Sequence, residues 1–225
     1  RPALALVLAA LGVAGALTAC NAIVGVQEVR LRRDAGLDDS GEEEPDVDVE
    51  PPEGSTPPEN LLEVAPGAQH TCARTPEGTV KCWGDDTQGQ TGTGGTADGG
   101  LHLEPQAVGI DDATAIASGK SHTCAVRRGG SVSCWGFNLD GQLGNGETNT
   151  KSSVPVSVTG LTNAVDVAAG GNFTCALRSS GSVACWGGNG SGQLGDGTKS
   201  TRAAPTSVRD LADAVAISAG EAHAC

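Results

Sequence analysis

Short stretches in which apolar and polar residues alternate recur along the chain from about residue 62 onward. In one copy, His122–Arg127 and Ser131–Trp135 alternate on either side of a Gly129-Gly130 turn. The apolar run Ala115–Ala117 precedes this pair, and Val154–Val158 follows a segment rich in turn residues. Because alternation with a period of two is typical of strands, and no segment has helical periodicity, the pattern predicts four short strands per copy.

The same pattern returns at a nearly fixed interval. The first cysteines of successive copies lie 52, 51 and 50 residues apart, at Cys72, Cys124, Cys175 and Cys225. In the third copy the four strands are expected at Val165–Ala168, Phe173–Arg178, Ser182–Trp186 and about Ala203–Val208. Four strands in a repeat of about 50 residues are typical of one blade of a β-propeller. The predicted fold is therefore all-β, with propeller blades of four antiparallel strands.

Three segments carry a more specific signature, and they read HTCARTPEGTVKCWG from His70, HTCAVRRGGSVSCWG from His122 and FTCALRSSGSVACWG from Phe173. The last two are followed by a G-Q-L-G-x-G loop, which is degenerate in the first copy because Thr91 replaces the leucine. This combination resembles the repeat of the regulator of chromosome condensation family. The resemblance implies a seven-bladed propeller.

The chain contains fewer copies than seven. We expect blades at about 61–112, 113–163 and 164–213, and a partial one at 214–225. Three blades cannot close a ring, and they would leave apolar end faces open. We therefore expect an incomplete sequence of a larger propeller. A three-bladed protein that closes by oligomerising is the alternative.

The first 19 residues are almost wholly apolar and end in Leu17-Thr18-Ala19 before Cys20. This resembles a bacterial lipoprotein signal peptide with its lipobox, in which the chain is cut before a cysteine that then carries lipid. The resemblance implies lipidation of Cys20. An uncleaved membrane helix or an ordinary secretory signal are the alternatives, since a helix of about 20 residues spans a bilayer.

A lipid on Cys20 would place the protein in the cell envelope, outside the cytoplasm, where disulfides persist. Asn21 follows the cysteine. The aspartate that is often associated with inner-membrane retention is therefore not at that position, so the outer membrane or the cell surface is favoured over the inner membrane. The membrane partner would be reached through the lipid alone.

Residues 20–60 form the predicted tether, and its acidic part, 34–60, contains 11 of the 27 acidic residues and no Lys or Arg. High charge, five prolines and no aromatic residue predict an extended, disordered spacer. A calcium-binding tract is the alternative. The remaining 16 acidic and 14 basic residues nearly balance (14 − 16 = −2), and no basic stripe is present to bind nucleic acid.

Six of the eight cysteines form three C-x9-C pairs: Cys72 and Cys82, Cys124 and Cys134, and Cys175 and Cys185. In a hairpin centred on Gly129, the two cysteines of the second pair stand directly opposite each other. Opposed residues have Cβ atoms about 4.5–5.5 Å apart, close to disulfide geometry. We predict one cross-strand disulfide in each blade. Cys225 is expected outside these pairs, because its partner would follow ten residues later.

Metal binding is the rival interpretation of the cysteines. His70 and His122 each precede a cysteine by two residues, but Phe173 takes that place in the third copy. A ligand set that loses its histidine, with a C-x9-C spacing, does not match a zinc site, so no metal is predicted. The family resemblance assigns the two histidines a supporting role, through hydrogen bonds within the blade. Three residues at one repeat position, Trp83, Trp135 and Trp186, are predicted to be part of the repeated core.

No catalytic constellation or cofactor motif is evident in the sequence. The glycine-rich loops lack phosphate-loop spacing, and the stretch from Asn138 to Gly141 resembles the start of a calcium loop without its final glutamate. We therefore expect a non-enzymatic module that binds a protein or a surface ligand. Loops such as Thr87–His102 and Gly144–Ser153 would carry its specificity. Guanine-nucleotide exchange, implied by the resemblance, and an enzyme with a channel site in absent blades are the alternatives.

Overall fold

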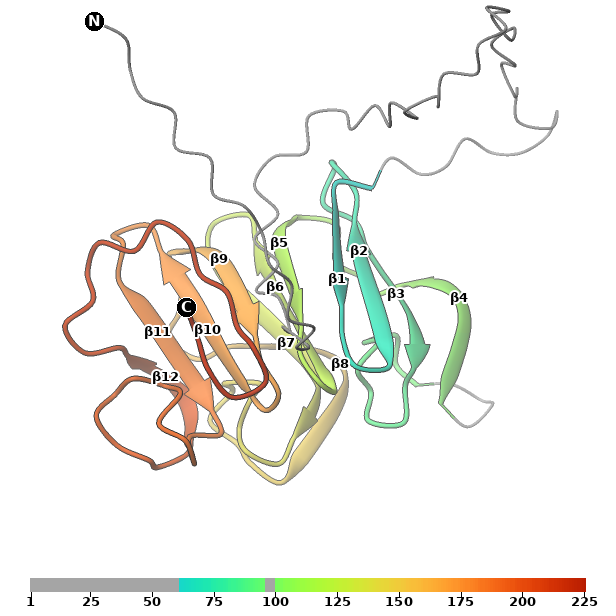
Figure 1. Cartoon of the computed structure of the whole chain (residues 1–225). Helices are drawn as coiled ribbons and strands as arrows, with labels where there is room; N and C mark the ends of the chain where they lie inside the picture. Colours follow the sequence, from blue (N-terminus) through green and yellow to red (C-terminus); the bar gives the residue numbers. More distant parts are fainter. Residues whose placement is uncertain (1–60, 96–99) are drawn as a thin grey trace, which may run out of the picture.

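The computed structural model describes residues 61–95 and 100–225 (Figure 1). The predicted signal peptide, Cys20 and the acidic tether lie outside the described residues. The described part contains three four-stranded sheets, one for each complete copy. The strands are β1 (Glu63–Pro66), β2 (His70–Arg74), β3 (Val80–Asp85), β4 (Leu101–Ala107), β5 (Ala113–Ser118), β6 (His122–Arg127), β7 (Val132–Asn138), β8 (Thr150–Ser157), β9 (Ala164–Ala169), β10 (Phe173–Arg178), β11 (Val183–Gly187) and β12 (Arg202–Ser207).

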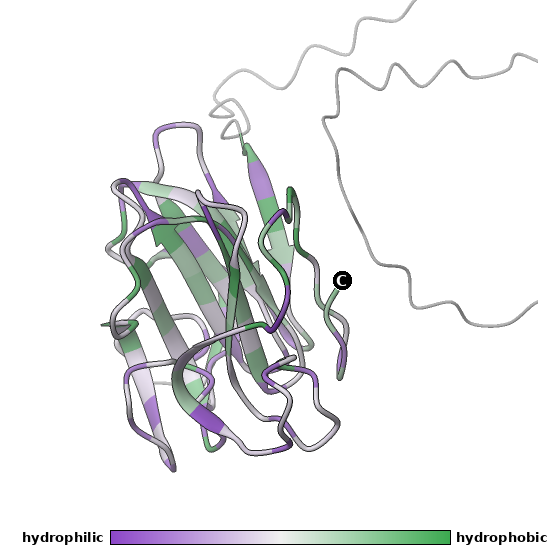
Figure 2. Ribbon diagram, turned by 90° about the vertical axis from the view of Figure 1, so that its left-hand side faces the viewer, coloured by the Kyte–Doolittle hydropathy of each residue, from purple (hydrophilic) through white to green (hydrophobic). Residues whose placement is uncertain are grey.

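Each sheet is an antiparallel meander in which sequential strands are neighbours. The three sheets stand side by side, and β5 contacts β1 on one side and β9 on the other (Figure 1). Hydrophobic residues concentrate along the strands, whereas hydrophilic residues are common in the loops (Figure 2). The prediction of all-β propeller blades is confirmed. No helix that could cross a bilayer is found in residues 61–95 and 100–225.

The central hairpin of each blade is closed by a glycine turn. In the second blade Gly129 and Gly130 adopt φ values of 97° and 82°. These values lie in the left-handed region, which glycine enters without a steric penalty. A side chain at Gly130 would also collide with the segment that leads into the next blade, because a Cβ there would lie 2.7 Å from the Thr162 carbonyl oxygen. The turn residues therefore fix both the hairpin and its approach to the neighbouring blade.

The hairpin register places the two cysteines of each blade opposite each other, and all three pairs form disulfides: Cys72–Cys82, Cys124–Cys134 and Cys175–Cys185. Cys225 belongs to none of them, and its backbone exchanges two hydrogen bonds of 2.9 Å with Ser218.

The hydrophobic core lies between blades rather than inside one sheet. Trp135 of the second blade packs with the Cys72–Cys82 pair of the first, and Trp186 of the third packs with the Cys124–Cys134 pair of the second. Both indoles are fully buried. In the third blade the corresponding space is a groove of about 530 Å³, whose lining includes the Cys175–Cys185 pair, Leu194 and part of the fourth copy.

Backbone carbonyls hold consecutive blades in register. The Gln90 carbonyl accepts a hydrogen bond of 2.9 Å from the Trp135 indole and one of 3.1 Å from the Thr123 hydroxyl. The Gln142 carbonyl accepts the equivalent bonds, 2.9 Å from Trp186 and 3.0 Å from Thr174. Each tryptophan therefore has a polar partner for its buried N–H group, as burial requires.

The repeated histidine also reaches across the blade boundary, which corrects the expectation of a bond within its own blade. The Nε2 atom of His70 lies 2.7 Å from the hydroxyl of Thr123, and that of His122 lies 3.0 Å from Thr174. Burial lowers the pKa of His70 to about 4, although nearby Asp85 and Asp86 act against the shift. Burial, and to a lesser extent the neighbouring His70, lowers the pKa of His122 to about 3. Both rings are therefore neutral at pH 7.

Proline recurs in the outermost strand of each blade, at Pro105 in β4, Pro155 in β8 and Pro205 in β12. The ladder between the third and fourth strands of every blade has an irregularity beside this position. Proline has no N–H group to donate, so it interrupts pairing at a sheet edge. The rim of the blades is thereby protected against addition of further strands.

Candidate ligand-binding cleft

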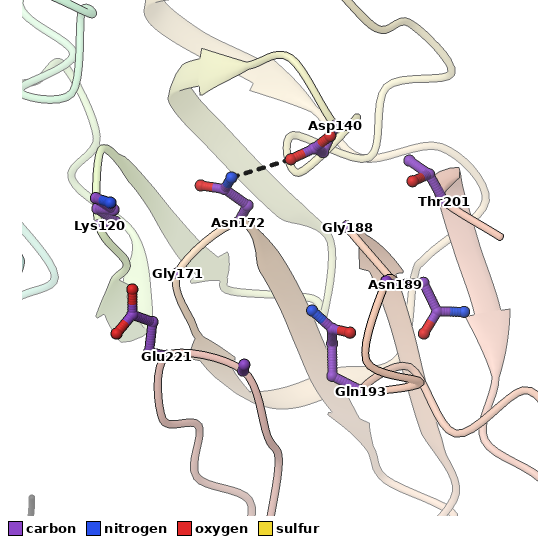
Figure 3. Close-up of a pocket in the computed structure, with 11 residues that line it drawn as sticks. Lys120, Asp140, Gly171, Asn172, Gly188, Asn189, Gln193, Thr201 and Glu221 are labelled. Carbon is purple, nitrogen blue, oxygen red and sulfur yellow. Dashed lines mark hydrogen bonds between the residues drawn. The ribbon is translucent and has the colours of Figure 1, made fainter. Parts of the chain in front are cut away.

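Loops at one end of the second and third blades enclose a polar cleft with a cavity volume of about 450 Å³ (Figure 3). The β5–β6 turn and the β7–β8 loop form one side, and the β9–β10 turn, the β11–β12 loop and the fourth copy form the other. These turns meet because the first and third strands of each antiparallel blade end at the same edge. The lining residues are Lys120, Asp140, Gly171, Asn172, Gly188, Asn189, Gly190, Gln193, Thr201, Glu221 and Ala222.

Two glycines of the third copy open this cleft. Gly188 and Gly190 stand at the repeat positions that Phe137 and Leu139 occupy in the second copy. A Cβ at Gly190 would meet no heavy atom within 4 Å, and one at Gly188 would lie 3.2 Å from the Asn172 carbonyl oxygen. Neither glycine has a positive φ. Their role is therefore to leave space and expose backbone, and the conformation does not itself require glycine.

A hydrogen bond between blades fixes one wall. The side-chain nitrogen of Asn172, in the β9–β10 turn, donates to Asp140 Oδ2 in the β7–β8 loop over 3.0 Å (Figure 3). The Asn172 carbonyl accepts from the Gly188 backbone over 2.7 Å. These contacts leave Asn172 Oδ1 and Asp140 Oδ1 without a hydrogen-bond partner among the described residues.

Gln193 forms the opposite wall. Its Oε1 atom accepts a hydrogen bond of 3.0 Å from the Ser191 backbone, which folds the side chain against its own loop. Its nitrogen points toward Asn172 and Gly188 in Figure 3 and has no hydrogen-bond acceptor in the described part of the chain. The equivalent nitrogen in the first copy, Nε2 of Gln90, donates to Asp85. The third copy has Gly188 at the position of Asp85, so this nitrogen has lost its acceptor.

Asn189 shapes the floor without offering a polar group to a ligand. Its Oδ1 atom accepts from the Leu194 backbone over 3.1 Å, and its nitrogen donates to the Thr198 and Ser200 carbonyls over 3.1 and 3.0 Å. Asn138 makes the same kind of contacts in the second copy. This buried asparagine holds the loop that carries Gln193.

An ion pair stabilises the distal part of the same loop. Asp196 accepts a hydrogen bond of 2.7 Å from the Thr198 hydroxyl and pairs with Arg202 Nη2 over 2.7 Å. The Thr198 hydroxyl first, and then the Arg202 guanidinium, hold the pKa of the Asp196 carboxyl well below its usual range. The carboxylate therefore stays charged down to acidic pH.

Lys120 and Glu221 lie at one end of the cleft, and both side chains are exposed (Figure 3). Their backbones connect the blades, because Lys120 N donates to the Gly170 carbonyl over 3.3 Å and Gly171 N donates to the Glu221 carbonyl over 2.9 Å. One ammonium and two carboxylates, counting Asp140, therefore surround a mainly neutral centre. Such a set can bind a ligand through directed hydrogen bonds and weak charge steering.

Most residues singled out in the sequence lie away from this cleft. The paired cysteines and Trp135 and Trp186 are in the core between blades, with His70 and His122, whereas Trp83 is only partly buried. Within the described residues, no group of three His, Cys, Asp or Glu side chains is placed to hold a metal ion. Asp140, considered above as part of a calcium loop, accepts from an asparagine of the next blade instead.

The loops predicted to carry specificity form a different hollow, of about 480 Å³, between the first and second blades. There, Lys151 Nζ donates to the Thr87 carbonyl over 2.9 Å. Sequence reasoning missed Asn172, Gln193 and Lys120 as candidate binding residues. The available signal was the difference between copies, since Gly188 and Gly190 depart from the bulky residues of the second copy.

Comparison with known sequences agrees with this repeat geometry. A profile of the regulator of chromosome condensation (RCC1) repeat matches residues 129–177 and 180–225, and a second profile of the same repeat matches 63–90, 113–142 and 164–193. The chain belongs to the RCC1 repeat family. Its RCC1 repeats account for the three blades and for the opening of the fourth.

Two curated relatives illustrate the range of proteins that contain such repeats. The chain is 33% identical over 173 residues to human HERC6, a probable E3 ubiquitin-protein ligase, covering 75% of this chain and 17% of the relative. It is 32% identical over 164 residues to the ultraviolet-B receptor UVR8 of Arabidopsis thaliana, covering 71% of this chain and 37% of the receptor. The chain thus spans well under half of either RCC1-repeat relative.

Solved structures share the RCC1 fold. Yeast RCC1 (Prp20), in a complex with Kap60, superposes with a TM-score of 0.65 and 23% identity, covering 74% of this chain and 41% of that one. Human WBSCR16 gives the same TM-score and identity, with coverages of 73% and 44%. At this identity the likeness establishes the fold of the blades, and function has to be argued from the site.

Proposed function

We propose that the chain is a non-enzymatic, lipid-anchored binding module of the cell envelope, and that the cleft receives its partner. The observation that carries the binding role is the set of unshared polar atoms around the cleft: Asn172 Oδ1, Asp140 Oδ1 and Gln193 Nε2. Polar atoms that belong to side chains held in place by hydrogen bonds within the protein, yet lack partners of their own, are suited to bind a ligand.

The location outside the cytoplasm is supported by two features of the sequence and one of the structure. Leu17–Cys20 matches a lipobox, and the acidic segment 34–60 has the composition of a spacer. Each blade also contains a disulfide, and disulfides persist mainly in oxidising compartments. A domain held on such a tether would present its loop faces to molecules at the cell surface.

A protein is the class of partner that we favour. Yeast Prp20 has been solved bound to the protein Kap60, and a further study of it addresses its binding to Gsp1p and histones. The cleft is ringed by two carboxylates and one ammonium, which does not favour a polyanion such as nucleic acid. Loops of a rigid propeller can vary in sequence without disturbing the blades, and this is typical of protein-binding surfaces.

The anchor is tested in bacterial cells with a fatty-acid analogue. We expect the full chain to incorporate the label and to fractionate with membranes, whereas Cys20→Ser does neither. Incorporation that persists in Cys20→Ser would contradict the lipidation. The binding role is judged separately, so that one result does not determine the other.

Binding at the cleft is tested by quantitative capture from an envelope extract. Gly190→Leu installs the residue found at this position in the second copy and adds bulk to the lining of the cleft, and Ser200→Leu places the same side chain on the same loop outside the cleft. We expect Gly190→Leu to lose a protein that the wild-type chain and Ser200→Leu both capture. Equal capture by all three would rule out the cleft as the binding surface.

A further inference from the structure

We propose that the cleft recognises the main chain of an extended peptide, with Asn172 Oδ1 accepting a peptide N–H and Gln193 Nε2 donating to a peptide C=O. This inference rests on the proposed function and specifies the chemistry of the same site. It follows from two side-chain amides, one on each wall, in which one polar atom is bonded within the protein and the other is available in the cleft.

In each of the two side-chain amides, one polar atom is bonded within the protein and the other is not. The Asn172 nitrogen donates to Asp140 over 3.0 Å, and its oxygen is left for a ligand. The Gln193 oxygen accepts from the Ser191 backbone over 3.0 Å, and its nitrogen is left for a ligand. Because these internal bonds prevent both amides from flipping, one wall offers only an acceptor and the other only a donor. A peptide group carries the complementary pair, one N–H and one C=O.

The floor between these walls is suited to close approach by a backbone. Gly188 and Gly190 present no side chains, and a ligand chain can lie directly on them. In the second copy Phe137 and Leu139 occupy these positions, and the hollow beside them has a volume of only about 200 Å³. The structure therefore provides the room for an extended chain between the second and third blades.

Other classes of ligand fit the lining less well. The lining residues include no aromatic side chain, so a nucleobase or a sugar ring would have no stacking surface. Asp140 and Glu221 would repel a phosphate, and only Lys120 would attract it. A neutral peptide group avoids both problems, because it needs hydrogen bonds and little net charge.

The charged end of the cleft adds a preference for particular side chains. Lys120 and Glu221 lie together there and are exposed, so each can attract an opposite charge on the bound peptide (Figure 3). Exposed pairs of this kind contribute little affinity, and they influence specificity and association rate more. We therefore expect the peptide backbone to supply most of the binding.

The test uses random octapeptides displayed on phage. They are selected on the purified full chain and counter-selected on Gly190→Leu, and the selected sequence is then synthesised with capped ends. Each main-chain nitrogen is methylated in turn. We expect N-methylation at one position, whatever the side chain there, to weaken binding at least tenfold, because it removes a hydrogen bond and adds bulk against the floor.

Variants of the chain then identify the two amides. Asn172→Ser introduces the residue of the second copy, Ser121, and Gln193→Ala removes the donor. Each is expected to weaken the peptide about fivefold, the loss that corresponds to one net hydrogen bond of about 1 kcal/mol, while Ser200→Leu binds as the wild type. Failure to select any peptide that discriminates against Gly190→Leu overturns the inference, as does indifference to every N-methyl group. A partner from the envelope that still requires an open cleft would leave the proposed function standing in that case.

Discussion

The imidazole of His122 and the hydroxyl of Thr174 lie 3.0 Å apart across the boundary between the second and third blades. The ring is fully buried and neutral, and burial lowers its pKa to about 3. The Thr174 hydroxyl donates to the Gln142 carbonyl, so it accepts from the Nε2–H group of the ring. Protonating the buried ring would cost the hydration of an imidazolium, so this contact between blades is most stable with the ring neutral.

This dependence predicts that stability falls with acid below pH 6.5. The unfolded chain binds protons on His70 and His122 near pH 6.5, whereas the folded chain does so only near pH 4 and pH 3. Stability from these groups is therefore complete above pH 6.5 and decreases as the pH falls, by up to about 1.4 kcal/mol per pH unit for each histidine. Urea unfolding between pH 7 and 4.5 measures the slope.

His122→Phe is the matched control for this prediction, since Phe173 occupies the position in the third copy. In this variant the free energy of unfolding should change less steeply with pH, because one of the two buried histidines no longer contributes. Glu63 and Asp166 change the free energy of unfolding in the opposite direction at acidic pH. Burial raises the pKa of each carboxyl, so the folded chain binds these protons more readily than the unfolded chain does. Taking the difference between variant and wild type removes their contribution. Identical slopes would show that His122 is not buried as a neutral ring.

The tryptophans should differ in their contribution to stability according to their position in the stack. Trp186 is fully buried and donates to the Gln142 carbonyl over 2.9 Å, whereas Trp83 is only partly buried. We expect Trp186→Ala to lower the free energy of unfolding by about 3–5 kcal/mol, a typical loss for a large buried aromatic residue. Trp83→Ala should lower the free energy of unfolding by clearly less than Trp186→Ala does. Urea titration followed by circular dichroism compares the two, and equal losses would contradict the packing between blades.

The disulfides should each contribute to stability although the loops that they close are short. Cys124 and Cys134 are 10 residues apart in sequence, and loop-closure entropy assigns such a bridge about 3 kcal/mol. The double variant Cys124→Ala/Cys134→Ala, which removes both partners of this bridge, should lose about this amount of unfolding free energy. Mass mapping of the unreduced chain, alkylated after denaturation, should find label on none of the six paired cysteines. Label on any of them in the native preparation would argue against a disulfide in every blade.

Asp86 offers a prediction of increased stability. It takes the repeat position of Asn138 and Asn189, and its Oδ1 accepts from the Thr91 backbone over 2.9 Å in the same way. Its buried Oδ2 has no hydrogen-bond partner among the described residues, and His102 Nε2 lies 3.7 Å away. Asp86→Asn should therefore raise the free energy of unfolding by about 1 kcal/mol, because it removes a buried carboxylate oxygen. Thermal unfolding at pH 7 measures the change, and a loss of stability would imply that the His102 contact is favourable.

The repeat pattern was sufficient to predict the blades. Strict alternation and a glycine turn located the inner hairpin, and the predicted Phe173–Arg178 strand coincides with β10. The outer strand was harder to place, since β8 begins at Thr150, four residues before the predicted Val154. Its first residues are polar and exposed or half-buried, as expected at a sheet edge, so they carry no periodic signal.

The cleft was not predicted, because its residues become neighbours only when blades stack. Asp140 and Asn172 are 32 positions apart and belong to different copies. Alternation within one copy reports which side of a strand faces the core, and it contains no information on which loops of adjacent copies meet. The partner of His122 was predicted incorrectly for the same reason, because it lies in the next blade.

Stacking of the blades relies on the main-chain oxygen of Gln142, and the carbonyl group is the same for every amino acid. A change elsewhere in the loops leaves this accepting oxygen in place, whereas the Gln142 side chain is itself buried and accepts from the Asp140 backbone over 2.9 Å. Selection is then able to redesign the outward groups of the loops one repeat at a time while the assembly keeps its geometry, and such a scaffold can acquire new recognition properties in small, independent steps.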